Sequence, residues 1–226
     1  NDGYLVKKKS RFDGSRLKTD PRYERVRENM AEFGTAAKAS KLVRNSIMSL
    51  LQIAKDDKTT SRLVKVLQAV QKTDATSVRG KRHVNKGNIQ LLSDFNFNKN
   101  AALTSVFHGV LTSAIDRITG AMAVVSSAFV PTNLITSPLG ATHYKMVCAG
   151  VELDFDNNIF LADNTETAYL PIDNISTSFN LQVNAPANST HKLMLVLGIK
   201  FFELVNGVQY PLSDNSANAL TVIKVS

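Results

Sequence analysis

The sequence predicts an α+β fold, in which an N-terminal basic helical hairpin is followed by an antiparallel β-sandwich of immunoglobulin-like or jelly-roll-like type. Three observations predict this fold. Apolar residues recur every three or four positions up to residue 73, which is the period of a helix. After residue 88 they alternate every second position, which is the period of a strand. Finally, two turn sequences that contain glycine, DRITG at 116–120 and Asn206-Gly207, each separate two such alternating runs.

Residues 1–18 are predicted to be a strand-like and basic N-terminal segment. Tyr4-Leu5-Val6 is its strand-like part, and a basic loop punctuated by glycine follows. Because the chain begins with Asn1 and not with Met, we expect residues to be missing upstream, and a lost signal peptide stays open.

Residues 19–73 are predicted to form the helical hairpin. Asp20-Pro21 is typical of a helix start, with an acceptor side chain before a proline in the first turn. The first helix is expected to reach Ala54 and to carry one apolar stripe, which includes Val26, Met30, Phe33, Ala37, Val43 and Ile47. Thr59 or Thr60 is expected to cap the second helix, whose apolar face is Leu63, Val66, Leu67 and Val70.

Residues 74–88 are predicted to be a basic linker. Its core, SVRGKRHVNKGN, holds four Lys and Arg residues, two glycines and no acid. We interpret it first as an interdomain connector, second as part of a contact between subunits, and third as a nucleic-acid site.

Residues 89–226 are predicted to form the β-sandwich. Strands are expected where apolar and β-branched residues alternate between turns rich in Asn, Asp, Ser and Pro. The expected strands are residues 88–92, 106–113, 121–127, 144–155, 176–183, 192–205 and 219–225.

No pattern typical of an enzyme is present, so we expect no catalytic, cofactor-binding or metal-binding residues and no small-molecule substrate. His83, His108, His143 and His191 have no metal-ligand spacing, and Cys148 is expected to be a buried core residue. No phosphate-binding loop or nucleophile elbow occurs. The acids at 152, 154 and 156 alternate on one expected strand, which favours an exposed acidic face over acid–base or calcium chemistry.

Charge is distributed unevenly along the chain. Residues 1–86 contain 21 Lys and Arg against 9 Asp and Glu, whereas residues 87–226 contain 6 against 10. The basic part favours, as an alternative function, a nucleic-acid-binding protein that contacts phosphates without sequence preference. Aromatic residues are sparse within the basic segments, however, so no stacking platform for bases is evident.

The function that the sequence favours is a non-enzymatic structural protein that assembles into a homo-oligomer or polymer: a filament, a tube or a virion-like shell. The basic part of one subunit would face the acidic part of the next. No apolar run is long enough to span a membrane, so we expect a soluble protein, with an extracellular or virion-associated location left open. The candidate assembly contacts are Tyr4, Leu5, Val6, Met30, Phe33, Ala37, Val43 and Ile47. The candidate charge contacts are Arg79, Lys81, Arg82 and Lys86 on one side and Glu152, Asp154 and Asp156 on the other.

Four stretches of the chain resemble a conserved hypothetical family of Bacteroidota. They are RENMAEFGTAAKASKLVRNSI, DATSVRGKRHVNKGNIQLLSDFNFN, DRITG and SAFVPTNLITSPLGATHYKMVCAGVELDF. The resemblance extends over nearly the whole chain. It implies a bacterial or phage-associated origin, and it implies no activity and no site residues.

Overall fold

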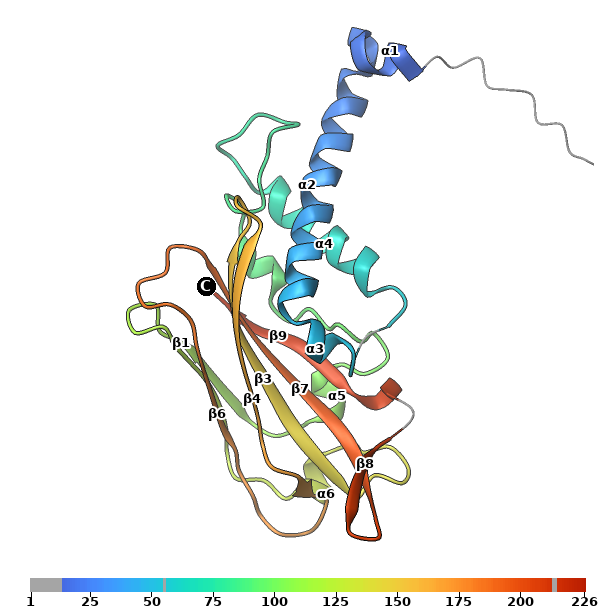
Figure 1. The fold of residues 1–226 in the computed structure, drawn as a ribbon, viewed down its shortest axis with the longest axis vertical. Helices are drawn as coiled ribbons and strands as arrows, with labels where there is room; N and C mark the ends of the chain where they lie inside the picture. The colour runs from blue at the N-terminus through green and yellow to red at the C-terminus, as the bar shows by residue number, and fades with distance from the viewer. Residues whose placement is uncertain (1–13, 55, 213–214) are drawn as a thin grey trace, which may run out of the picture.

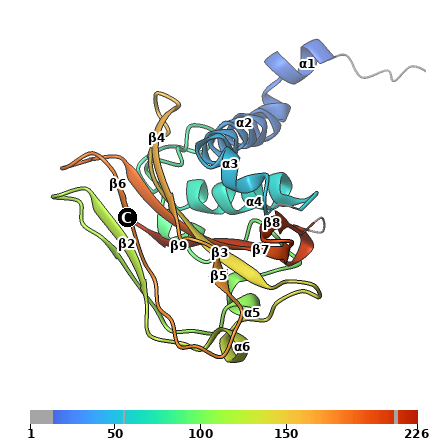
Figure 2. The ribbon, with the colours of Figure 1, turned by 60° about the horizontal axis from the view of Figure 1, so that its bottom comes forward.

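A layer of helices lies on one face of a β-sheet, and a second sheet lies on the other face (Figures 1 and 2). The computed structural model describes residues 14–54, 56–212 and 215–226. The α+β class expected from the sequence is confirmed, with helices followed by antiparallel sheets. The strand-like prediction for Tyr4, Leu5 and Val6 lies outside the described residues.

The helical layer consists of five elements. They are α1 (Gly14–Thr19), η1 (Pro21–Tyr23), α2 (Glu24–Ser46), α3 (Met48–Leu51) and α4 (Thr59–Lys72). The Asp20 side chain accepts the backbone N–H of Arg22, so the expected cap is confirmed, although the first turn that it caps is 3₁₀-helical. Residues 14–18, which were expected to be loop, belong to the helix α1.

The first long helix is shorter than expected. It ends at Ser46 because Ile47 leaves the helical conformation, with φ −124° and ψ 28°, and α3 then continues to Leu51. The Ser46 hydroxyl donates to the Val43 carbonyl, a local bond that competes with the helical pattern.

The second long helix, α4, begins at the expected position but without the expected cap. Lys58 occupies the N-cap position and makes no side-chain cap. Thr59 is the first helical residue, and its hydroxyl bonds to the carbonyl of Phe97 at 2.6 Å, which ties the helix to a distant loop. Leu63, Leu67 and Val70 are buried as expected, together with Val64 in place of Val66.

The larger sheet has six strands in the order β4-β3-β7-β8, with β9 paired to β7 and β5 paired to β3. Its strands are β3 (His143–Asp154), β4 (Ile159–Glu166), β5 (Leu170–Pro171), β7 (Lys192–Val205), β8 (Val208–Pro211) and β9 (Ala219–Val225). The smaller sheet has the order β1-β2-β6, formed by β1 (Leu111–Ile115), β2 (Ala121–Ser126) and β6 (Asn180–Asn184).

The large sheet is the middle layer of the molecule, because the side chains of β3 alternate between two cores. Val147, Val151 and their neighbours at odd positions pack towards α2 and α4 (Figure 2). Met146 and Cys148 pack against the small sheet. Burial on both faces explains why β3 and β7 are nearly continuous apolar runs.

Both hairpin predictions are confirmed. β1 and β2 pair antiparallel around residues 116–120, where Gly120 has φ +81°. β7 and β8 pair around Asn206 and Gly207, and both of these residues have positive φ, as the tight hairpin turn requires.

Several expected strands are wrong in part. Residues 88–92 form a 3₁₀ turn, η2 (Ile89–Leu92), because the Asn88 side chain accepts the backbone N–H of Gln90. Of residues 106–113, the first ends the short helix α5 (Leu103–Val106), and only 111–113 belong to a strand, β1. Residues 176–183 form a strand only from Asn180. The remaining short elements are α6 (Pro131–Leu134) and η3 (Asn215–Ala217).

Strand β4 was not expected at all. Its residues are exposed or half-exposed along the whole length, so no alternation of apolar and polar residues marks it in the sequence.

Candidate interaction surface

The two halves of α2 lie in different surroundings. The C-terminal half packs on the sheet and on α4, whereas the N-terminal half extends beyond the sheet (Figure 1). Val43 and Ile47, two candidate assembly contacts, are 0% and 1% exposed in the chain's own core. They are therefore not accessible to a partner. Ala37 is half-buried against the same core.

The N-terminal half of α2 carries three exposed apolar side chains, which we call the apolar stripe: Val26, Met30 and Phe33. Their exposed fractions are 42%, 58% and 53%. Their spacing of four and three residues places them on the same side of the helix. With Asn29 and Gln68 of α4 they border a shallow groove of about 450 Å³. Met30 and Phe33 are thus accessible on the surface, and their role as assembly contacts stays a prediction.

The side of α2 that faces away from the stripe is held by residues 77–83, which we call the clamp loop. The Gly80 N–H donates to the Glu32 carboxylate at 2.8 Å. Arg79 donates to the Asn29 side chain at 2.9 Å and pairs with Glu28 at 3.3 Å. The clamp loop is thus bonded to residues about fifty positions earlier in the sequence.

Asp74 shapes the start of the clamp loop. Its carboxylate accepts the backbone N–H groups of Thr76, Ser77 and His83. Burial by itself raises the pKa of Asp74, but these bonds, that of His83 first, outweigh burial and lower the pKa well below its usual range. Gly80 has φ +85°, and a Cβ there would lie 2.9 Å from Cγ of Glu28, so glycine permits the close approach.

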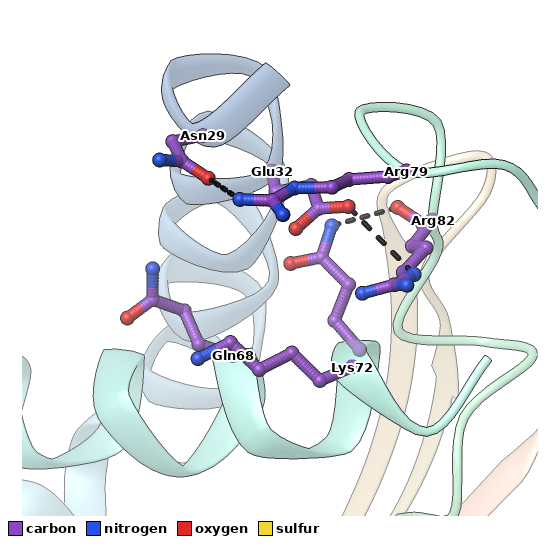
Figure 3. Close-up of a pocket in the computed structure, with 7 residues that line it drawn as sticks. Asn29, Glu32, Gln68, Lys72, Arg79 and Arg82 are labelled. Atoms are coloured by element: carbon purple, nitrogen blue, oxygen red, sulfur yellow. Dashed lines mark hydrogen bonds and ion pairs between the residues drawn. The ribbon is translucent and has the colours of Figure 1, made fainter. Parts of the chain in front are cut away.

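A polar pocket of about 520 Å³ lies between α2, the end of α4 and the clamp loop (Figure 3). Arg82 lies 3.9 Å from Glu32 there, and the Gln71 side chain donates to the Arg82 carbonyl at 2.7 Å. Asn29 and Gln68 border both this pocket and the groove of the apolar stripe. The structure thus brings Arg79 and Arg82 to one pocket, but Lys81 and Lys86 do not line it.

Lys81 and Lys86, the other two basic candidates, lie on the surface. Lys81 is exposed, and the Lys86 ammonium lies 3.5 Å from the Ser77 hydroxyl.

The three acidic candidates do not form one exposed face. Glu152 is 8% exposed and bonds to the Ser189 hydroxyl. Asp154 ends β3, and the Asn157 backbone and side chain bond to it and lower its pKa. Asp156 lies in the following turn and accepts the Asn85 amide at 2.7 Å. The loop 74–88 and the acidic turn therefore already touch within one chain.

Cys148 is a buried free thiol, as the sequence predicted, and burial raises its pKa to about 12. Across the described ranges, no three His, Cys, Asp or Glu side chains gather where they would hold a metal ion. None of the described helices is both long and apolar enough to cross a membrane.

Glu28, Asn29 and Glu32 were not predicted as site residues. The signal that would have found them is local: Glu28 and Glu32 lie one turn apart on a basic helix, which marks an acidic strip on the side away from the apolar stripe. What the sequence does not show is which basic segment meets this strip.

Comparison with protein-family models, with curated proteins and with solved structures gives no match. The resemblance to a Bacteroidota family therefore stays a prediction.

Proposed function

We propose that this protein is a non-enzymatic structural protein whose copies associate into a polymer such as a filament, a tube or a virion-like shell. The observation that carries the proposal is the apolar stripe, whose three large side chains are 42–58% exposed on a helix that extends beyond the sheet. Burial of apolar surface stabilises a contact by about 25 cal/mol per Å². The stripe therefore favours association with another apolar surface.

The partner in this proposal is a second copy of the chain. A stable interface needs roughly 800 Å² from each partner, which is more than three side chains supply. A second apolar pair lies on one face of β4, where Ile159 and Leu161 are 58% and 54% exposed. When two different patches meet, the contact is head-to-tail, and it leads to a ring or an open filament.

The position of β4 at one end of the large sheet supports this partner. Edge strands present unpaired backbone groups, and soluble proteins usually protect them with charge or by cover. The shared core between the two sheets also supports a sandwich of immunoglobulin-like or jelly-roll-like type as the building unit, with α2 and α4 as a helical hairpin outside it.

A dilution series tests the proposal. Size-exclusion chromatography and negative-stain microscopy should show particles or fibres that dissociate as the protein is diluted. Phe33→Glu should shift the chain to monomer, because it places a charge within the stripe. Leu139→Glu is the matched control, since Leu139 is fully exposed in a loop away from the stripe and should change nothing. A monomer at all accessible concentrations would refute the proposal.

Nucleic-acid binding through the basic segments remains the alternative function. Ion pairs with Asp20 and Glu28 engage Arg22, Arg25 and Arg79 within the chain, which leaves fewer free cations for phosphates. If the alternative holds, affinity for a random duplex falls steeply with salt, and the variant with Lys81→Ala and Arg82→Ala reduces that slope. Undetectable binding at low salt would exclude it.

A further inference from the structure

We propose that the polar pocket between α2, α4 and the clamp loop is a binding site for a small phosphate-bearing ligand. This inference does not depend on self-assembly. Its volume of about 520 Å³ is within the range of roughly 300–1,000 Å³ typical of small-molecule sites. Its lining differs from the usual apolar one, because every residue that forms it is polar or charged.

The charge of the lining favours an anion. Lys72, Arg79 and Arg82 supply three cations, and Glu32 supplies one carboxylate. Gln68 and Gln71, both on α4, complete the wall, and Figure 3 shows Gln68 on the helix below the pocket. Glu28 pairs with Arg79 beside the pocket, so three cations face two carboxylates. An excess of one positive charge in a recess between three segments attracts oxyanions more strongly than the same charge does on an open surface.

The basic side chains are also placed in advance of binding. Arg79 crosses from the loop to α2 and donates to the Asn29 side chain (Figure 3). It also pairs with Glu28 at 3.3 Å. Arg82 is placed beside Glu32 at 3.9 Å. A guanidinium that is already oriented loses little conformational entropy when it binds a phosphate oxygen.

Two of the cations have donors to spare. The buried Nε of Arg82 lies 3.9 Å from the Glu32 carboxylate, which is too far for a hydrogen bond, and it has no hydrogen-bond partner among the described residues. A buried donor without an acceptor is costly, and a ligand oxygen would satisfy it. Lys72 is exposed at the end of α4, and its side chain makes no hydrogen bond or ion pair with the part of the chain that the structure describes.

Isothermal titration calorimetry of the full chain with pyrophosphate at low salt tests the proposal. We expect one site per chain. Each charge-assisted hydrogen bond that is removed should weaken binding about tenfold or more, so Lys72→Gln and Arg82→Gln should each have this effect. Lys81→Gln is the matched control for Arg82→Gln, because it removes one positive charge from the clamp loop at a residue outside the pocket. The affinity of this variant for pyrophosphate should stay within about twofold of wild type.

A further variant and a second anion extend the test. Glu32→Gln removes the carboxylate from the lining and should tighten pyrophosphate binding, whereas damage to the fold would weaken it. If Arg82→Gln fails to fold, Lys72→Gln still tests the proposal, because the exposed Lys72 side chain makes no hydrogen bond or ion pair with the described residues. The proposal is overturned by absence of binding up to about 10 mM pyrophosphate. It is equally overturned if Lys81→Gln weakens binding as much as Lys72→Gln, or if citrate binds as tightly as pyrophosphate.

Discussion

The C-terminal and N-terminal halves of α2 are parts of one continuous helix, but they bury their apolar residues differently. Leu42, Val43 and Ile47 are at most 3% exposed in the core between helices and sheet. Met30 and Phe33 lie a few turns earlier and are more than half exposed. On the N-terminal half, the clamp loop covers the acidic side of the helix and binds it through polar contacts. An apolar period in the sequence therefore predicts a helix, but not what covers it.

The largest expected effect is at the C-terminal half. Ile47→Ala should lower the free energy of unfolding by about 2–5 kcal/mol, because it leaves a cavity in a packed core. Met48→Ala is the matched control, since Met48 is adjacent and 45% exposed. Urea denaturation measures both. Equal losses for the two variants would show that the core is not packed as described.

A smaller effect is expected at the clamp. Glu32→Ala leaves the Gly80 N–H without its acceptor and should cost about 1–3 kcal/mol. Glu203→Ala, an exposed acid on β7, should cost little, and urea denaturation compares the two. If Glu32→Ala costs no more than Glu203→Ala, the clamp loop does not hold α2.

The stabilising effect of the clamp loop should also depend on pH, through Asp74. Because the folded state lowers the pKa of Asp74, its stabilising effect is complete above the unfolded value of about 4 and is lost as pH falls through the lower folded value. Wild type should therefore be more stable than Asp74→Asn at pH 7, and the difference should shrink below about pH 4. Urea midpoints across this pH range measure it, and a difference that does not change with pH would contradict the account.

The smallest effect on folding is expected at the apolar stripe. Met30→Ala should change the free energy of unfolding by less than about 0.5 kcal/mol, because the side chain is 58% exposed. Thermal melting of dilute protein checks this. A loss comparable to that of Ile47→Ala would mean that the stripe is part of the folded core.

Much of the fold could be predicted from local pattern. β2, β3, β7 and β9 lie within one or two residues of the expected ranges, because alternation or a long apolar run marks each of them. β4 could not be predicted, since a strand exposed on both faces has no period to detect. The turn at Ile89–Leu92 is apolar enough to resemble a strand, and the Asn88 cap determines its conformation instead.

The candidate surface was predicted only in part. Met30 and Phe33 were expected as contacts from their spacing, and they are exposed. Val43, in the C-terminal half of α2, and Ile47, just beyond its end, were expected on the same stripe but lie in the chain's own core, because they pack towards α4 and the sheet. The clamp depends on contacts between residues 48 and 50 positions apart, such as Gly80 with Glu32 and Arg79 with Asn29, which no local pattern encodes.

Sedimentation velocity over a wide concentration range tests the central claim, that the apolar stripe joins copies of the chain. Wild type and Leu139→Glu should both sediment as concentration-dependent oligomers, and a variant with Met30→Glu and Phe33→Glu should sediment as a monomer with unchanged thermal stability. The opposite result, in which the stripe variant and wild type sediment alike at every concentration, would contradict the claim.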